Sequence, residues 1–411
     1  MAKPAHTMDV SPLPPGGGFL LSPVGQERIR TPQDFTEDQR AFFRTAEKFA
    51  QERILAHAAL IEKKDYALVR QLLCEAGELG LLGLDVPEAY GGLAQDLTSS
   101  MLVTEAMAKL GSWSVTFGAQ VGIGSLPIVY FGTEAQKRKY LPKLVSGEWV
   151  AAYALSESSS GSDALGATTK AVLSHDRSHF VLNGAKQWIS NAGFADVFIV
   201  FAKIDGEHFS AFIVERGTPG FSLGAEEHKM GIRGSSTCPL VFEDARVPVE
   251  NLLGEPGKGY KIAIETLNEG RIGIGAQMLG LAEGAWGHAA RYAQQRRQFG
   301  KTLAEFQAVQ FALAQMATEI EAARLMVYNA ARLKDAGQPF VREAAMCKLY
   351  ASQVAERVAS QCVEIFGGNG FVRDYPAEKY FRDSKVGKIY EGTSNMQLAT
   401  IAKQVLKGSG Q

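Results

Sequence analysis

The pattern of apolar and polar residues divides the chain into three zones. From about residue 34 to 147, apolar residues recur at helical spacing. Thr36 followed by Gln39 has the form of a capping box, which marks the beginning of a helix. Two further helices are expected in this zone, at about 66–82 and 97–109. The first zone is therefore predicted to be helical.

From about residue 149 to 247 the pattern changes to short alternating or continuous apolar runs, which are typical of strands. Asn183–Gly184 separates one such run at 180–182 from another at 186–189. Because both residues of an Asn-Gly pair tolerate positive φ, this pair predicts a tight hairpin. Further strands are predicted at 197–201 and 211–214. We expect a small antiparallel β domain here.

The third zone, from about residue 260 to 407, is again helical but has longer segments. Four long helices are predicted, near 260–293, 303–335, 341–366 and 384–406. Long helices joined by short connections form an antiparallel bundle. We therefore predict an α+β fold with an N-terminal helical domain, a middle antiparallel β domain and a C-terminal four-helix bundle. Their predicted bounds, after an N-terminal arm at 1–33, are 34–148, 149–255 and 256–411.

The composition supports several domains and argues against some classes of partner. At 411 residues and 44.4 kDa the chain is too long for one simple core. Its net charge of -1 does not favour nucleic acid or an anionic membrane surface, since both bind an excess of Lys and Arg. No stretch reaches the roughly 18 apolar residues of a membrane span. We expect no nucleic-acid partner and no membrane span.

The cysteines and the N-terminus bear on the compartment. The four cysteines are widely spaced and form no Cys-x-x-Cys pair, which favours free thiols in a reducing environment. The N-terminus lacks a basic start followed by an apolar core, so no secretory signal is expected. These features favour a bacterial-type cytoplasm, or a mitochondrial matrix for a chain whose transit peptide has been removed.

One segment near the C-terminus combines a carboxylate with small residues. Glu391 lies in Tyr-Glu-Gly-Thr-Ser-Asn at 390–395, downstream of the glycine-rich run at 366–371. A carboxylate can abstract a carbon-bound proton, and small residues leave the backbone open to a planar cofactor. A single Glu taken alone is usually a surface residue, so the prediction depends on the whole segment.

Two segments of the β zone could bind a polar ring or a phosphate. The run 153–163 contains several serines, including Ser156 and Ser162, whose hydroxyls and neighbouring amides suit such a ligand. The alternative is an ordinary Ser-rich loop. Trp188 and Ser190 follow in Trp-Ile-Ser-Asn, where a lone Trp is more often a core residue than a cofactor contact.

Two arginines of the third zone are also candidates for binding a ligand. Arg296 precedes Phe299 and Gln307, and an Arg can pair with a pyrophosphate. The alternative is a helix junction with solvated charges. Arg271 follows Asn268 near the start of a predicted bundle helix, where the alternative is a helix-capping role.

Taken together, these segments resemble the acyl-CoA dehydrogenase family, from about residue 34 to the end of the chain. The order helical domain, β domain, helical bundle matches the architecture of that family. The resemblance implies an FAD-dependent enzyme of fatty acid β-oxidation that converts an acyl-CoA to a trans-2-enoyl-CoA. It also implies electron-transfer flavoprotein as the electron acceptor and a homotetramer built as a dimer of dimers.

The resemblance implies a role for each segment. Glu391 is the implied catalytic base, and no metal is implied. The implied FAD-binding residues are Tyr153, Leu155, Ser156, Ser162, Trp188, Ser190, Arg296, Phe299, Gln307, Glu364, Gly368, Thr393 and Asn395. The implied acyl-CoA-binding residues are Ser162, Tyr260, Asn268, Arg271 and Gly392.

Three of these positions depart from the usual family pattern. Ser156 and Ser190 replace the commoner Thr but keep the hydroxyl. Glu364 stands where many members have Gln, and a carboxylate beside a pyrophosphate is unfavourable. In the family, the residues matching 296–307 and 364–368 bind the FAD of the neighbouring subunit.

A second position for the base exists in the family, on a bundle helix immediately before the Arg. That position is Gly270 here, which cannot act as a base. Glu269 is one residue away, and one residue turns a helix by about 100°. Glu391 is therefore the predicted base.

Different segments point to different acyl chains. The runs 228–239, 268–274 and 328–333, together with Glu364, resemble short/branched-chain members, which we favour. The runs 35–40 and 117–120 resemble very-long-chain members, so a medium- or long-chain enzyme is the alternative. Small residues could leave a deeper acyl pocket or merely allow tight helix packing; they are Gly118, Ala119, Gly122 and Gly124.

Two further classes share these motifs or this fold. An acyl-CoA oxidase would pass its electrons to oxygen and is usually a longer chain. A non-catalytic, nucleic-acid-binding relative would need a strongly basic extra domain, and the net charge of -1 opposes it.

Overall fold

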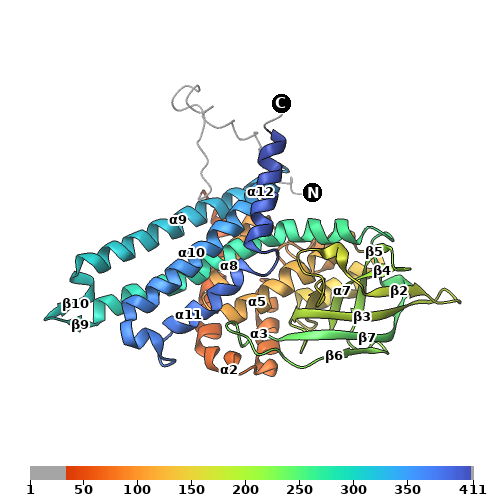
Figure 1. Cartoon of the computed structure of the whole chain (residues 1–411), viewed down its shortest axis with the longest axis horizontal. Coiled ribbons are helices and arrows are strands. Elements are labelled where there is room, and N and C mark those ends of the chain that lie inside the picture. Colours follow the sequence, from red (N-terminus) through yellow and green to blue (C-terminus); the bar gives the residue numbers. More distant parts are fainter. Residues whose placement is uncertain (1–33, 409–411) are drawn as a thin grey trace, which may run out of the picture.

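The computed structural model describes residues 34–408, so the predicted N-terminal arm lies outside the described residues. Figure 1 shows an elongated molecule with long helices at one end and a sheet at the other. The N-terminal helices lie between these two parts (Figure 1). The three zones of the sequence therefore correspond to three regions of the structure.

The first zone is helical, as predicted. Its capping box is present, because Gln39 N donates to Thr36 Oγ1 at 3.1 Å and Thr36 N donates to Gln39 Oε1 at 3.0 Å. The elements are α1 Glu37–Phe49, η2 Ala50–Ile54, η3 Leu55–His57, α2 Ala58–Glu62, α3 Tyr66–Glu78, η4 Glu88–Tyr90, α4 Leu97–Met107, α5 Gly111–Ala119, η5 Gln120–Gly124, α6 Leu126–Phe131 and α7 Glu134–Val145.

One helical run is longer than expected. Gly111–Phe131, which comprises α5, η5 and α6, is long and apolar enough to cross a membrane by length and composition. The expectation that no segment reaches this length is wrong for this run. In the fold, 67% of its most apolar window is buried, as for the core helix of a soluble protein. Its apolar character is therefore explained by packing.

The middle zone forms a sheet of eight strands in the order β6-β7-β3-β2-β4-β5-β8, with β1 paired to β4. Most pairings are antiparallel, as expected, but β1 and β2 each run parallel to β4. The strands are β1 Ala151–Ala154, β2 Lys170–Leu173, β3 His179–Ser190, β4 Val197–Ile204, β5 His208–Glu215, β6 Phe221–Leu223, β7 Thr237–Pro248 and β8 Leu252–Leu253; the short helices η6 Ala164–Gly166 and η7 Val249–Asn251 lie between them.

The predicted hairpin at Asn183–Gly184 is wrong. These residues lie inside β3, which continues from His179 to Ser190 and pairs with β2 and β7. The register against β7 shifts between Leu182 and Gly184, so the glycine marks a bulge. A Cβ at Gly184 would lie 2.7 Å from Thr169 Oγ1. The glycine is therefore required by a close approach within the sheet, not by a turn.

The last zone contains three of the four predicted bundle helices. They are α8 Gly259–Gln295, α9 Gln307–Asp335 and α10 Val341–Phe366. The predicted fourth helix at 384–406 is present only from Ser394, as α12, because the chain leaves helical geometry at Glu391 (φ +48°) and Gly392 (φ +92°). The remaining elements are β9 Arg297–Gln298, β10 Lys301–Thr302, η8 Leu303–Glu305, η9 Gly367–Phe371, α11 Ala377–Ser384, η10 Lys385–Lys388 and α12 Ser394–Gly408.

Apolar cores cross the borders between the zones. One core cluster joins Trp113 and Phe117 of α5 to Phe198 and Leu240 of the sheet. A second cluster packs α4 against α8, α9 and α10. Because α5 and η5 contact both the sheet and α8, the end of the sheet is held beside the helix that carries Arg271.

Candidate active site

The loop between η10 and α12 carries Glu391. Its backbone is left-handed at Glu391 (φ +48°) and at Gly392 (φ +92°). A non-glycine residue with positive φ is uncommon and persists only where the surroundings hold it. Two donors hold this turn, since Lys348 Nζ and Gln397 Nε2 both reach the Gly392 carbonyl, at 2.5 and 2.8 Å.

The carboxylate of Glu391 points at α8. A Cβ built on Gly270 would lie only 2.5 Å from Glu391 Oε2. Any other residue at 270 would therefore displace the carboxylate. Glu269 faces elsewhere, because its carboxylate accepts a hydrogen bond from Tyr130 at 2.8 Å. The structure thus brings the predicted base beside Gly270, the second position considered for a base in the sequence.

The surroundings of Glu391 weaken its acidity. Burial raises the pKa of Glu391 to about 7, although the positive charges of Lys348 and Arg271 act in the opposite direction. Burial also lowers the pKa of Arg271, whose guanidinium donates to Asn268 Oδ1 at 2.7 Å. A carboxylate with a pKa near neutrality can take up and release a proton under physiological conditions.

Unpaired polar atoms gather around this carboxylate. Among the described residues, eight buried side-chain polar atoms lack a hydrogen-bond partner, and five of them belong to this part of the molecule. Buried polar groups are nearly always paired, so this concentration fits a place that receives a polar ligand. The five atoms are Tyr153 Oη, Arg271 Nε, Glu391 Oε2, Ser394 Oγ and Gln397 Oε1.

The segment after β1 is held by a buried ion pair. Lys186 Nζ donates to Glu157 Oε1 at 2.7 Å and to the Leu155 carbonyl at 3.2 Å. The Ser156 carbonyl accepts from Gln187 N at 2.9 Å. Hydrogen bonds to the carbonyls of Leu155 and Ser156 therefore fix this segment, while Ser162 lies exposed further along the loop.

Trp188 is not a core residue. It has positive φ (+64°), is 58% exposed and lies at an irregularity of β3. Ser190 follows at the end of the strand, paired with Thr237. An exposed Trp ring between two hydroxyl-bearing segments fits the flat ring of a flavin, which would cover it. The residues present therefore suit FAD.

A second group of predicted FAD-binding residues lies at the far end of the bundle. Arg296 ends α8, 25 residues after Arg271, which corresponds to about 37 Å at 1.5 Å per residue. Phe299 is 92% exposed at the tip that carries β9 and β10, opposite the sheet (Figure 1). The rest of this group consists of Gln307, Glu364 and Gly368, all exposed.

The structure therefore does not bring all the predicted cofactor residues together in one chain. Tyr153, Arg271 and Gly392 lie around Glu391, as their mutual electrostatic and backbone contacts show. Thr393 immediately precedes α12 and the exposed Asn395 is its second residue, while Tyr260 is the second residue of α8 and has 44% of its surface exposed. The group of Arg296 is separated from the residues around Glu391 by most of the length of α8.

Three residues around Glu391 were missed from the sequence. Lys348 and Gln397 hold the turn, and Gln277 accepts a hydrogen bond from Tyr390. Lys348 falls on the same face of α10 as the buried Ala344, Ala345 and Ser352. A lysine on an apolar helix face was the available signal, since a buried lysine requires a partner.

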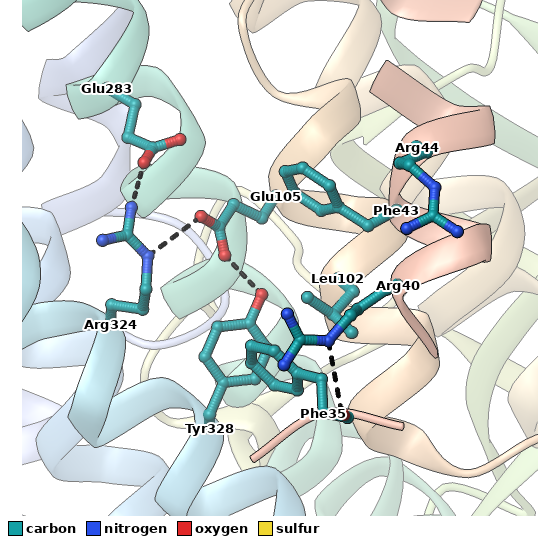
Figure 2. Close-up of a pocket in the computed structure, with 9 residues that line it drawn as sticks. All are labelled: Phe35, Arg40, Phe43, Arg44, Leu102, Glu105, Glu283, Arg324 and Tyr328. Atoms are coloured by element: carbon teal, nitrogen blue, oxygen red, sulfur yellow. Dashed lines mark hydrogen bonds and ion pairs between the residues drawn. The ribbon is translucent and has the colours of Figure 1, made fainter. Parts of the chain in front are cut away.

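A separate cavity of about 420 Å³ lies away from Glu391, where α1 and α4 meet α8 and α9. Figure 2 shows Glu105 at its centre, accepting a hydrogen bond from Tyr328 and pairing with Arg324, which also pairs with Glu283. Phe35, Phe43 and Leu102 form the apolar walls. Because these charged groups already satisfy one another, the network has the form of a structural contact between helices.

Comparison with known families matches the chain in three parts. The acyl-CoA dehydrogenase N-terminal domain matches residues 36–148, the middle domain 152–245 and the C-terminal domain 257–406. Among curated proteins, the chain is 46% identical to a probable acyl-CoA dehydrogenase of Bacillus subtilis, over 96% of this chain and 70% of that protein. It is also 46% identical to a probable short/branched chain specific acyl-CoA dehydrogenase of Dictyostelium discoideum, over 90% of this chain and 91% of that protein.

Solved structures give the same result. An acyl-CoA dehydrogenase complexed with FAD from Bacillus anthracis superposes with a TM-score of 0.91 at 44% identity, covering 96% of this chain and 70% of that one. A chain from a structural study of the electron transferring flavoprotein of Acidaminococcus fermentans superposes with a TM-score of 0.87 at 45% identity, covering 91% and 99%.

Proposed function

The chain belongs to the acyl-CoA dehydrogenase family of FAD-dependent oxidoreductases, and on that premise we propose that it oxidises a short or branched acyl-CoA to the trans-2-enoyl-CoA with Glu391 as base. The observation that carries the proposal is the buried, unpaired Oε2 of Glu391, in a carboxylate whose pKa is raised to about 7. Such an atom is free to accept a proton from carbon.

In the proposed reaction, Glu391 takes the proton from the α-carbon of the thioester. The proton goes to Oε2, and burial favours the resulting neutral acid. Negative charge then develops on the thioester oxygen, where the backbone N–H of Glu391 would stabilise it. Bound FAD supplies the redox chemistry by accepting the hydrogen and electron pair that leave the β-carbon.

We place the FAD ring against Trp188, with Ser156 and Ser190 as hydroxyl contacts, and the adenine half against Arg296 and Phe299 of a neighbouring copy. The separation of about 37 Å along α8 supports this division, because one chain cannot present both groups to the same molecule. A site completed by another copy requires an oligomer, and we propose the homotetramer usual in the family.

The short or branched chain is supported by relatives that carry this specificity in their names, such as the Dictyostelium protein. The small residues at 118–124 were expected either to deepen the acyl pocket or to allow tight helix packing. The surroundings of Gly124 and Gly122 favour a different explanation for each. A Cβ at Gly124 would lie 2.6 Å from Ala151 Cβ, so this glycine allows close packing. A Cβ at Gly122 would meet nothing within 4 Å, so this glycine leaves space beside α8. A medium or longer acyl chain is therefore the second candidate.

We propose electron-transfer flavoprotein as the acceptor and a place in fatty acid β-oxidation. The structural relative studied with the electron transferring flavoprotein of Acidaminococcus fermentans supports the first part. Relatives in Bacillus subtilis and in rat mitochondria fit either of the compartments considered above. The bacterial-type cytoplasm is our proposal for this chain.

An anaerobic titration of the purified yellow protein tests the function. The panel is butyryl-, isobutyryl-, 2-methylbutyryl-, isovaleryl-, octanoyl- and palmitoyl-CoA, and bleaching of the flavin is the readout. We expect bleaching by the short and branched members and reoxidation by added electron-transfer flavoprotein. Absence of bleaching across the panel with FAD bound would refute the dehydrogenase function, while bleaching only by octanoyl- or palmitoyl-CoA would refute the short-chain assignment.

A further inference from the structure

A fully buried lysine contacts the loop that carries the predicted base. Lys348 lies on α10 with 0% of its surface exposed. Its Nζ donates to the carbonyl of Gly392, the residue after Glu391, at 2.5 Å. Gln397 Nε2 donates to the same carbonyl at 2.8 Å and reaches the Glu391 carbonyl at 3.4 Å. Two side chains from α10 and α12 therefore hold the left-handed turn that aims the carboxylate.

An amide alone could hold a carbonyl at much lower cost. Removing an ammonium from water is unfavourable, and burial accordingly lowers the pKa of Lys348 to about 8. The opposing contribution comes from the negative charge of Glu391. A charge buried at this cost beside a carboxylate points to a function for the charge itself, in addition to the hydrogen bond.

We propose, resting on the dehydrogenase function above, that Lys348 is a positioning residue that fixes the turn of Glu391 and holds its carboxylate in the anionic form needed to accept the α-proton. Because Nζ bonds to a backbone carbonyl, this contact survives when Glu391 becomes protonated. The turn therefore keeps its shape through the proton transfer. A direct ion pair would instead occupy the oxygen that must receive the proton.

Other charged and titratable groups face this pair. Arg271 of α8 also favours the anionic form of Glu391, although burial weakens its own charge. Tyr153 of β1 and Tyr390 are neutral, since burial and the charge of Glu391 raise their pKa values well above the usual range. Loss of the Lys348 charge is therefore only partly compensated by the single remaining cation among these groups.

The test is the pH dependence of flavin reduction in a single anaerobic turnover. We compare the wild type with Lys348→Gln, which keeps a donor for the Gly392 carbonyl but removes the charge, and with Lys348→Met, which removes both. In both variants the acid limb of the profile should move upward by one pH unit or more, so that the rate at pH 6, expressed as a fraction of the plateau, is at least about tenfold lower than in the wild type. Lys348→Met should additionally lower the plateau, because the turn is released.

Ser352→Ala is the matched control. Ser352 lies one turn further along α10, is fully buried, and donates to the Lys348 and Gly387 carbonyls at 2.7 and 2.9 Å. Its loss should cost stability without moving the acid limb. An acid limb that stays within 0.2 pH units of the wild type in Lys348→Gln overturns the role of the charge. A wild type that no acyl-CoA can reduce refutes the dehydrogenase function instead, so the two failures are distinguishable.

If Lys348→Met does not fold, Lys348→Gln alone decides the role of the charge. If neither variant folds, a solvent-deuterium exchange experiment on Lys348→Arg replaces them. Exchange of the α-hydrogen of a bound acyl-CoA should then keep the wild-type acid limb, because the charge is retained. An upward shift of one unit in Lys348→Arg would overturn the proposal.

Discussion

Within residues 34–408, two fully buried lysines lie near a glutamate, and the pKa values of the two glutamates are shifted in opposite directions. Lys186 pairs directly with Glu157 at 2.7 Å behind the Ser156 segment. Lys348 lies near Glu391 but donates to a backbone carbonyl instead. Contacts from Lys186 and from Thr168 and Thr169 lower the pKa of Glu157 to about 2. Burial raises the pKa of Glu391 to about 7.

The difference shows that a neighbouring cation does not decide the state of a buried carboxylate by itself. Glu157 accepts hydrogen bonds at both oxygens, so its charge is compensated and it stays an anion. Glu391 Oε2 has no partner, so burial dominates. The first arrangement suits a structural link, and the second suits a base.

The largest effect is expected from removing the carboxylate of Glu391. Glu391→Gln keeps the size of the side chain but cannot take up the α-proton. We expect turnover to fall by about 1,000- to 10,000-fold with FAD still bound. Steady-state assays with the best acyl-CoA, alongside the flavin spectrum, measure both quantities. A variant that keeps most of its rate would disprove the assignment.

Glu105→Gln is the matched control for that variant. Glu105 is also a buried glutamate with a raised pKa, but its oxygens are occupied by Tyr328 and Arg324 in the network of Figure 2. Its replacement should leave turnover within about twofold and lower the free energy of unfolding by about 1–3 kcal/mol. A large loss of turnover in Glu105→Gln would mean that the unpaired oxygen of Glu391 does not distinguish a catalytic glutamate from a structural one.

Breaking the structural pair should affect stability. Lys186→Met leaves Glu157 buried without its cation, which should lower the free energy of unfolding by about 3–5 kcal/mol. Denaturation followed by circular dichroism measures this. Lys170→Met, at an exposed position of β2, is the control and should change stability by less than about 0.5 kcal/mol. Equal denaturation midpoints for the two variants would contradict the role of the pair.

The two glutamates should also respond to different ranges of pH. The pKa of Glu157 is about 2 in the folded chain against 4.5 ordinarily, so its stabilisation is present above pH 4.5 and is lost as the pH falls toward 2. Glu391, with a pKa of about 7, keeps a proton in the folded state between pH 4.5 and 7 that the unfolded chain releases. Its contribution to stability therefore declines as the pH rises through that window.

Activity should follow Glu391 alone. Flavin reduction should rise about tenfold per pH unit up to pH 7 and then level off, while the protein remains folded down to about pH 4.5. Stopped-flow reduction and circular dichroism over the same pH series separate the two behaviours. Loss of activity and of fold at the same pH would contradict this separation.

A smaller effect is expected at the distant cofactor group. Arg296→Ala should weaken FAD binding by about 1.5–3 kcal/mol, because a charged hydrogen bond is lost, and should loosen the oligomer. Flavin content after gel filtration and the elution volume report both. Arg138→Ala, an exposed arginine of α7, is the control and should keep FAD and assembly unchanged. A fully flavinated tetramer of Arg296→Ala would contradict the shared site.

The smallest effect concerns the acyl chain. Gly122→Leu should fold, because its Cβ has free space, and should favour shorter acyl-CoAs by about tenfold. The ratio of kcat/KM for butyryl- and octanoyl-CoA measures the change. Gly124→Ala, which meets Ala151 Cβ at 2.6 Å, should lower stability and leave that ratio unchanged. If Gly122→Leu leaves this ratio unchanged, η5 does not line the acyl-binding site.

The sequence predicted local structure best where local rules suffice. The capping box at Thr36 and the long periodic helices of the bundle are confirmed. The Asn183–Gly184 hairpin failed because pairing of β3 with strands on both sides overrides the turn preference of two residues. The continuous helix predicted across Glu391 failed because Lys348 of α10 and Gln397 of α12 hold a left-handed turn at 391–392.

The candidate site depended more on the family resemblance than on patterns in the chain. Spacing alone gives no reason to place Glu391 beside Gly270, since the two are far apart in sequence and meet only through packing of the last loop on α8. Lys348 was missed because a lysine on a helix is usually solvated. The apolar face of α10 on which it lies was a signal, but the contacts that bury this lysine come from the packing of α10 against α8 and α12.

The most direct measurement moves the base. In Gly270→Glu, the Cβ of the new side chain would lie only 2.5 Å from the place that Glu391 Oε2 occupies in the wild type. We compare Glu391→Gly with Glu391→Gly/Gly270→Glu by the rate of flavin reduction in a single anaerobic turnover at pH 8. A carboxylate restored to this place should reduce the flavin at least about tenfold faster than Glu391→Gly. A double variant that binds FAD and acyl-CoA normally but is no faster than the single variant would contradict the assignment of proton abstraction to this point of the structure.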